Sequence, residues 1–208
     1  MIFETLVVGP LGVNCFILGD EETKEGIIID PGSDIERILN KINRIGLKVK
    51  TILNTHGHFD HIGANAKIIS TLGAKLLIHK SDAAFLTRAN EYASLYGLKA
   101  EDSPPPNSFL EDAMEITFGK YQLKVLHTPG HSSGGCCFYL ASEKMLFTGD
   151  TLFAEGVGRT DLPGSSEQAL RQSIKTKLFV LADDTAVYAG HGPSSTIGHE
   201  KSHNPFIH

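Results

Sequence analysis

Several features that mark particular classes of protein are missing from this chain of 208 residues. No apolar run approaches the ~20 residues that a membrane-spanning helix needs, so we expect no membrane association. No cluster of Lys and Arg is present and the formal net charge is −5, which argues against a nucleic-acid-binding protein. The first charged residue is Glu4, whereas a signal peptide begins with a basic region, so we expect a cytoplasmic protein.

Cysteine is also scarce. The three cysteines are Cys15, Cys136 and Cys137, an odd number that, without a signal peptide, predicts reduced thiols. The adjacent pair lies in an apolar run ending at Leu140, so we interpret it as part of a buried strand, with a redox role as the alternative. Hydrophobic residues make up 41% of the chain and charged residues 21%, values typical of a globular protein. We expect one domain over residues 1–208.

Short strand patterns alternate with helical patterns, and they fall into two similar halves. The sequence predicts strands at 3–8, 14–18, 26–29, 49–53, 75–78, 122–126, 136–140, 145–148 and 186–189. It predicts helices that start at 30–33 and stop at Gly46, that run over 64–72, that follow a capping Ser81, and that cover 166–181. The proline-rich segment 97–107 is predicted to be a loop, either a cover over a substrate or an inert connector. These elements favour two sheets with helices outside them.

The segment from Thr55 to His61 carries the strongest functional signal. It reads Thr-His-Gly-His-Phe-Asp-His and so places three imidazoles and a carboxylate within seven residues. Imidazole suits zinc, iron and neighbouring transition metals, and a carboxylate adds an oxygen ligand. The segment therefore predicts a metal site, which open coordination positions would make catalytic rather than structural.

Four predicted strands end in residues that can bind a metal. These residues are His56, His131, Asp150 and His191. Each would be a weak signal by itself, but their shared position after a strand indicates that all four lie on one rim. Glycines beside them allow sharp turns and a close approach of the backbone.

These residues resemble the metallo-β-lactamase-fold hydrolases. The signature HxHxDH of that family is matched by His56, His58, Asp60 and His61. Three further segments are similar to its later ligand motifs, in the same order: Gly130-His131-Ser132, Gly149-Asp150-Thr151 and Gly190-His191-Gly192. The resemblance extends from near Thr5 to the end of the chain and implies an α+β fold, a four-layer αβ/βα sandwich with the site at one edge of its two sheets.

The resemblance also implies two divalent metal ions. It assigns the first ion to His56, His58 and His131, the second to Asp60, His61 and His191, and a bridging position to Asp150. A hydroxide held between the ions is the expected nucleophile, because metal binding can lower the pKa of water to about 7. Asp60 and Asp150 are the predicted catalytic carboxylates. Zinc is the first choice, with iron or manganese as alternatives, because His and Asp sites accept all three.

Within the fold, the segments 148–153 and 156–161 are most similar to glyoxalase II, a thioesterase that hydrolyses S-acylglutathione. Arg159, Thr160 and Asp161 stand where the two-domain enzymes tend to have Lys and an aromatic pair, and we expect no separate C-terminal helical glutathione-binding domain. The chain is more similar to compact, single-domain glyoxalase II-like proteins. The expected partner is therefore a small-molecule thioester like S-lactoylglutathione. Arg159 either binds a substrate carboxylate or pairs with an acid such as Asp161.

Other functions use the same ligands. A persulfide dioxygenase resembles the chain in the segment 158–161 and would hold one iron on His56, His131 and Asp150. Lactone or β-lactam hydrolysis is a further alternative, a nuclease is disfavoured by the acidic balance, and a metal-binding protein without catalysis would show no turnover. The sequence does not predict the oligomeric state.

Four polar residues outside the signature, two of them taken as a pair, have more than one interpretation. Asp30 either orients the ligand loop or forms an ordinary turn before Pro-Gly. His127 is favoured as a structural residue over a hydrogen-bond partner of the site. His199 and His203 have the spacing of a helical metal pair, but they lie in a polar tail, and a metal site there is the weaker hypothesis.

Overall fold

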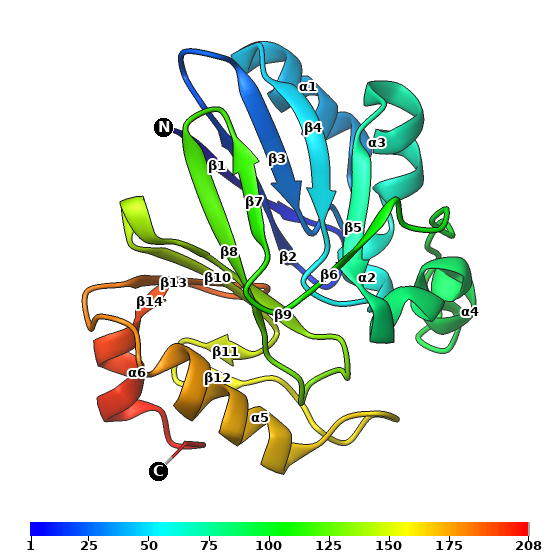
Figure 1. Ribbon diagram of the computed structural model, residues 1–208. Helices are drawn as coiled ribbons and strands as arrows, with labels where there is room; N and C mark the ends of the chain where they lie inside the picture. Colours follow the sequence, from blue (N-terminus) through cyan, green and yellow to red (C-terminus); the bar gives the residue numbers. More distant parts are fainter. Residues whose placement is uncertain (208) are drawn as a thin grey trace.

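Two six-stranded sheets face each other in the computed structural model, which describes residues 1–207 (Figure 1). The strands of the first sheet lie in chain order: β1 (Ile2–Val8), β2 (Val13–Gly19), β3 (Glu25–Ile29), β4 (Lys48–Leu53), β5 (Lys75–His79) and β6 (Ser108–Leu110). The second sheet has the order β14-β13-β10-β9-β8-β7, formed by β7 (Glu115–Phe118), β8 (Tyr121–His127), β9 (Cys136–Leu140), β10 (Met145–Gly149), β13 (Ala186–Ala189) and β14 (Ser195–Thr196). A small hairpin joins β11 (Leu152–Phe153) to β12 (Gly156–Val157).

Helices cover the outer face of each sheet. The elements on the side of the first sheet are α1 (Ile35–Ile45), α2 (Phe59–Ile62), α3 (Asn65–Leu72), the 3₁₀ helix η1 (Lys80–Arg88) and α4 (Ala89–Ser94). Those on the side of the second sheet are α5 (Glu167–Ser173), the π-helical turn η3 (Ile174–Leu178) and α6 (Ile197–His203), and a 3₁₀ turn η2 (Ala141–Glu143) links β9 to β10. The predicted four-layer αβ/βα sandwich is confirmed.

The alternation of side chains along β3 shows how the layers form. Ile28 packs with α1 and α3 in one buried cluster, whereas Ile27 and Ile29 lie in a second cluster between the sheets. Successive side chains of a strand point to opposite faces, so a continuous apolar strand can pack against the helices on one face and against the second sheet on the other. A third cluster, which includes Leu146 and Leu170, attaches α5 and α6 to the second sheet.

The main differences from the predicted elements lie at helix ends. The first helix begins at Ile35, later than predicted, and Asp34 before it has a left-handed conformation. Asp30 therefore lies in the turn between β3 and α1, outside the helix. Ser81 is not the cap of its helix: His79 holds that position and accepts a hydrogen bond from the Ser81 amide. The helix predicted over 166–181 ends its regular part at Ser173 and widens into the π turn η3.

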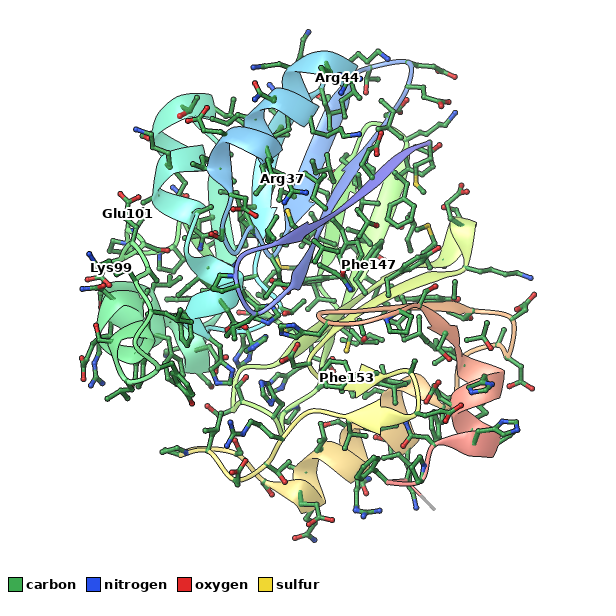
Figure 2. The ribbon with its side chains drawn as sticks, turned by 180° about the vertical axis from the view of Figure 1, so that it is seen from behind. Arg37, Arg44, Lys99, Glu101, Phe147 and Phe153 are labelled. Atoms are coloured by element: carbon green, nitrogen blue, oxygen red, sulfur yellow. The ribbon has the colours of Figure 1, made fainter. Side chains whose placement is uncertain are left out.

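The predicted loop is confirmed as irregular structure between α4 and β6. Its Ser103 is buried and donates to the carbonyl of Ile62, and Lys99 and Glu101 stand at the outer rim of the molecule (Figure 2). The three cysteines are unpaired, and Cys136 and Cys137 are buried in β9, as predicted; Cys15 is buried as well. Burial raises the pKa of the Cys137 thiol to about 11. Within residues 1–207, none of the helices combines the length and the apolar character needed to cross a membrane.

Candidate metal centre

The ends of β4, β8, β10 and β13 meet at one edge of the two sheets, and the side chains that follow them converge. His56, His58 and His131 bring ring nitrogens within 4.8 Å of one another. Asp60, His61 and His191 form a second group within the same limit. The structure thus brings together the residues of the two ligand sets that the family resemblance implies, and we call them the first and the second ligand group.

Asp150 lies between the two groups. Its Oδ2 is 3.6 Å from Nε2 of His131 in the first group and 3.7 Å from Nε2 of His191 in the second, and its Oδ1 is 3.5 Å from Nε2 of His61. The carboxylate can reach this position because its neighbours lack side chains. A Cβ on Gly190 would lie 2.3 Å from Asp150 Oδ1, and Gly149 has a left-handed φ of 49°.

The distances between ring nitrogens within each group match those between two ligand atoms of one metal ion. His58 Nδ1 and His131 Nε2 are 3.0 Å apart, and His61 Nε2 and His191 Nε2 are 3.3 Å apart. Two nitrogens bound to one ion at about 2.0–2.1 Å would lie at similar separations in a tetrahedral site. Asp60 Oδ2 lies 3.4 Å from His191 Nε2 and 3.7 Å from His61 Nε2.

Outer hydrogen bonds fix the orientation of two rings through carbonyl groups. His131 Nδ1 donates to the carbonyl of Arg159 at 2.9 Å, and His191 Nδ1 donates to the carbonyl of Leu11 at 3.0 Å. A carbonyl accepts only, so each ring carries its proton on Nδ1 and presents a free Nε2 lone pair to the centre.

Asp30 orients two further rings, His61 directly and His56 through Thr55, so the first of its two predicted roles is observed. Its Oδ2 accepts from Nδ1 of His61 at 3.0 Å and from the Thr55 hydroxyl at 2.6 Å, while its Oδ1 accepts from the Thr55 amide at 2.7 Å. Since the Thr55 hydroxyl proton is used in this way, its oxygen accepts from His56 Nδ1 at 3.0 Å. Both imidazoles therefore turn Nε2 toward the ligand groups.

Two buried atoms at the centre lack a hydrogen-bond partner among the described residues. They are His56 Nε2 and Asp150 Oδ1. Buried polar atoms without a partner are rare in folded proteins, and a lone-pair nitrogen next to a carboxylate oxygen suits a cation. The donor set of imidazoles and carboxylates fits zinc, iron or manganese, so the residues present fit the two predicted metal ions.

The electrostatics of the protein prepare the first group for a cation. Burial, together with neighbouring imidazoles, holds the pKa of His56 well below its usual range and lowers that of His58 to about 3.

The second group differs in its electrostatics. Burial also opposes protonation of His61, but the carboxylates of Asp150, Asp60 and Asp30 outweigh it and raise the pKa of His61 to about 10. Metal binding at the second group must therefore displace a proton.

Asp82 is a site residue that the sequence analysis missed. Its buried carboxylate accepts from the Gly57 amide at 3.0 Å and from the Gly134 amide at 2.6 Å, so it ties the ligand loop after β4 to the loop after His131. A signal for it existed, because Asp82 follows the strand β5 in the same way that the other acids and histidines follow theirs. His127 does not belong to either group: its ring bonds to the Ser133 carbonyl and stacks on His79.

Arg159 forms a bidentate salt bridge with Asp161, with both N···O distances at 2.7 Å. The structural pair suggested by the sequence is thus present. The side chain nevertheless lines the cavity in front of the metal centre. Gly158 before it is packed so tightly that a Cβ would lie 1.9 Å from the Asp150 carbonyl, which explains the glycine at this turn.

A cavity of about 510 Å³ opens in front of both groups. Its floor contains the candidate ligands His58, Asp60, His131, Asp150 and His191. Its walls are formed by Leu11, Phe59, Phe85, Tyr92, Leu95, Tyr96, Arg159, Leu162 and Pro163. Among the described residues of 97–107, none lines this cavity, although Leu98, Lys99 and Ala100 line a smaller neighbouring pocket together with Asp60. His199 and His203, the weaker hypothetical pair, stack on each other in α6 outside it.

Comparison with known proteins agrees with this geometry. Residues 8–191 match the model of the metallo-beta-lactamase superfamily. The chain belongs to that superfamily. A hydroxyacylglutathione hydrolase GloC from Haemophilus influenzae is 38% identical to it over 209 residues, covering 100% of this chain and 98% of that relative.

Three solved structures are similar to this protein over nearly the whole chain. The BLEG-1 B3 metallo-beta-lactamase has a TM-score of 0.92 at 37% identity and covers 99% of each chain. TTHA1623 in a di-iron-bound form has a TM-score of 0.90 at 38% identity and covers 98% of this chain and 99% of its own. ETHE1 from Myxococcus xanthus has a TM-score of 0.84 at 28% identity and covers 99% of this chain and 84% of its own.

Proposed function

We propose that this protein is a two-metal hydrolase that cleaves thioesters of the S-acylglutathione type. The observation that carries the proposal is the position of Asp150 between two complete ligand groups, 3.6 Å from His131 on one side and 3.5 Å from His61 on the other. A carboxylate in this position can serve two cations at once. The likeness to a relative named hydroxyacylglutathione hydrolase supports the thioester as substrate.

Two bound divalent cations would supply an activated water and a positive charge opposite the carbonyl oxygen of the substrate. The chain's own residues hold the geometry for that chemistry. Asp60 would serve as a ligand, because His61 and His191, against the effect of burial, hold the pKa of its carboxyl well below the usual range and keep it ionised. The described cavity lining offers no Ser or Cys nucleophile, so the proposed nucleophile is the activated water.

A thioester suits this site because thiolate is a good leaving group. The lowered pKa of Asp60 keeps its carboxyl ionised, so Asp60 would not act as the acid that a poor leaving group needs. Arg159 is proposed to contact the polar end of the substrate at the mouth, while Asp161 keeps its guanidinium oriented.

A persulfide dioxygenase is the second candidate. It would use one iron on His56, His131 and Asp150, and the di-iron form of TTHA1623 supports iron as a metal that this type of site accepts. The complete second group favours the hydrolase, because a single-iron enzyme would not need Asp60, His61 and His191 as ligands.

The decisive experiment combines metal analysis with two assays on one anaerobically purified sample. We expect two metal ions per chain and release of thiol from S-lactoylglutathione without oxygen uptake. Oxygen uptake with glutathione persulfide, together with a single iron per chain, would reverse the ranking. Cleavage of a β-lactam or a lactone at a higher kcat/KM than any thioester would also reject the thioesterase proposal.

A further inference from the structure

The walls of the cavity differ sharply from its floor. Aromatic and aliphatic side chains line one side, with Phe85 edge-on to His58 at 6.0 Å between ring centroids and Tyr92 packed on Phe85 at 5.3 Å. Phe59 and Tyr96 form a second aromatic pair in the lining, with centroids 5.6 Å apart. Two aromatic pairs thus line the cavity, and the first of them begins beside the candidate metal ligand His58.

Charge is nearly absent from the same walls. Among the described lining residues outside the ligand groups and Asp150, Arg159 is the one charged side chain, and Asp161 already neutralises it. Glutathione carries carboxylates and an ammonium group, which would lose water inside this cavity without gaining partners. The charged carrier therefore fits the solvent side of the mouth better than the interior.

The mouth itself exposes apolar surface. Leu95 is 76% exposed and Tyr96 is 55% exposed, and both line the cavity. Leu162 and Pro163 also line the cavity. Large apolar side chains gathered around a concave site are typical of the place where an apolar ligand binds.

We propose that the acyl group of the substrate is uncharged and apolar, with a ring or a branched chain that fills the aromatic cavity. This inference rests on the proposed thioesterase function and specifies its substrate class. The acyl arm enters the cavity beside Phe85 and Tyr92, and the thiol carrier stays at the mouth. A lactoyl group is small and hydroxylated, so it leaves most of the wall uncovered.

Four thioesters test the inference: lactoyl and phenylacetyl groups, each on glutathione and on the neutral thiol N-acetylcysteamine. The metal-loaded protein is assayed with each, and every kcat/KM is divided by the rate constant for hydrolysis by hydroxide to remove intrinsic reactivity. We expect phenylacetyl to exceed lactoyl at least tenfold on both carriers. A lactoyl preference on both carriers, or a tenfold dependence on glutathione whatever the acyl group, would overturn this inference and leave the thioesterase intact. Failure to cleave all four would reject both proposals.

A pair of surface variants gives an independent readout. Leu95→Asp places a charge on the cavity mouth, whereas Val180→Asp makes the same change at a side chain that is 70% exposed and does not line the cavity. We expect Leu95→Asp to reduce phenylacetyl turnover at least fivefold, mainly through KM, and to reduce it more than lactoyl turnover. Calorimetry should show phenylacetate binding more weakly to Leu95→Asp than to Val180→Asp. Equal behaviour of the two variants in both measurements would contradict the inference.

Discussion

The two ligand groups of this protein differ in chemistry and in exposure. The first consists of imidazoles alone, and His56 and His131 are 2% and 5% exposed. The second contains a carboxylate and opens to the cavity, where the side chain of His191 is 28% exposed. The cavity opens in front of both groups, so the main contrast between them is the carboxylate of Asp60, which belongs to the second group.

Loss of the shared carboxylate should have the largest effect. Asp150→Ala removes the one residue that lies beside both groups, so we expect both ions to bind weakly and turnover to fall by more than the roughly 100-fold typical of an outer partner. Metal content by elemental analysis and kcat/KM are measured together. Asp161→Asn, an acid outside the groups, is the control and should retain both ions. Near-normal activity of Asp150→Ala would exclude the bridging role.

Single-histidine variants should separate the two groups. His56→Ala should lose the first ion and His191→Ala the second, each keeping the other ion, because the two rings belong to different groups. The measurement is metal stoichiometry after dialysis, with His203→Ala, an exposed imidazole on α6, as the control. Loss of both ions in each variant would mean that the two ions bind cooperatively. The two groups would then not be independent metal sites.

Asp82 tests whether the first group depends on its support. Asp82→Asn replaces one acceptor oxygen by an amide nitrogen, so the bond to Gly57 or to Gly134 is lost. We expect about a 10-fold weaker affinity for one metal ion, at the lower end of the range for outer partners. Competition with a chromogenic chelator measures this affinity. The surface variant Asp184→Asn should match the unmodified protein, and an unchanged first site in Asp82→Asn would contradict the supporting role.

The smallest expected effect is on the pH dependence of the free energy of unfolding, at a residue outside the metal centre, Asp20. The Glu22 amide, followed by the Lys120 amide, holds the pKa of the Asp20 carboxyl below its ordinary value. A lowered pKa in the folded state adds stability above the unfolded pKa, near 4, and this stability is lost as the pH falls through the folded value.

The free energy of unfolding of Asp20→Asn should accordingly approach that of the unmodified protein as the pH is lowered from 7 toward 3. Urea denaturation of both metal-free proteins at a series of pH values measures the difference. The part of the pH dependence of unfolding that Asp20→Asn does not remove must come from other groups, including the acidic second ligand group. A difference that does not change with pH would show that Asp20 contributes through shape alone.

Much of the candidate site was visible in the sequence, because the residues concerned occupy positions that local rules can identify. His56, His58, Asp60 and His61 are neighbours in the chain, and His131 follows a strand that its apolar pattern predicts. The π turn at 174–178 and the capping role of His79 were missed, since both depend on contacts that no local pattern encodes. Asp82 was missed because an acid after a strand also occurs in ordinary turns.

The sequence by itself determined the layer order and the identity of the candidate ligands, since apolar periodicity sets the strands and imidazole is a metal ligand in any fold. Only the tertiary structure decided which nitrogen of each ring faces the centre, through carbonyls as distant in sequence as Leu11 and Arg159. It also decided that Arg159 is paired and that the cavity wall is aromatic. These properties arise from segments far apart in the chain, and only packing brings such segments within hydrogen-bonding distance.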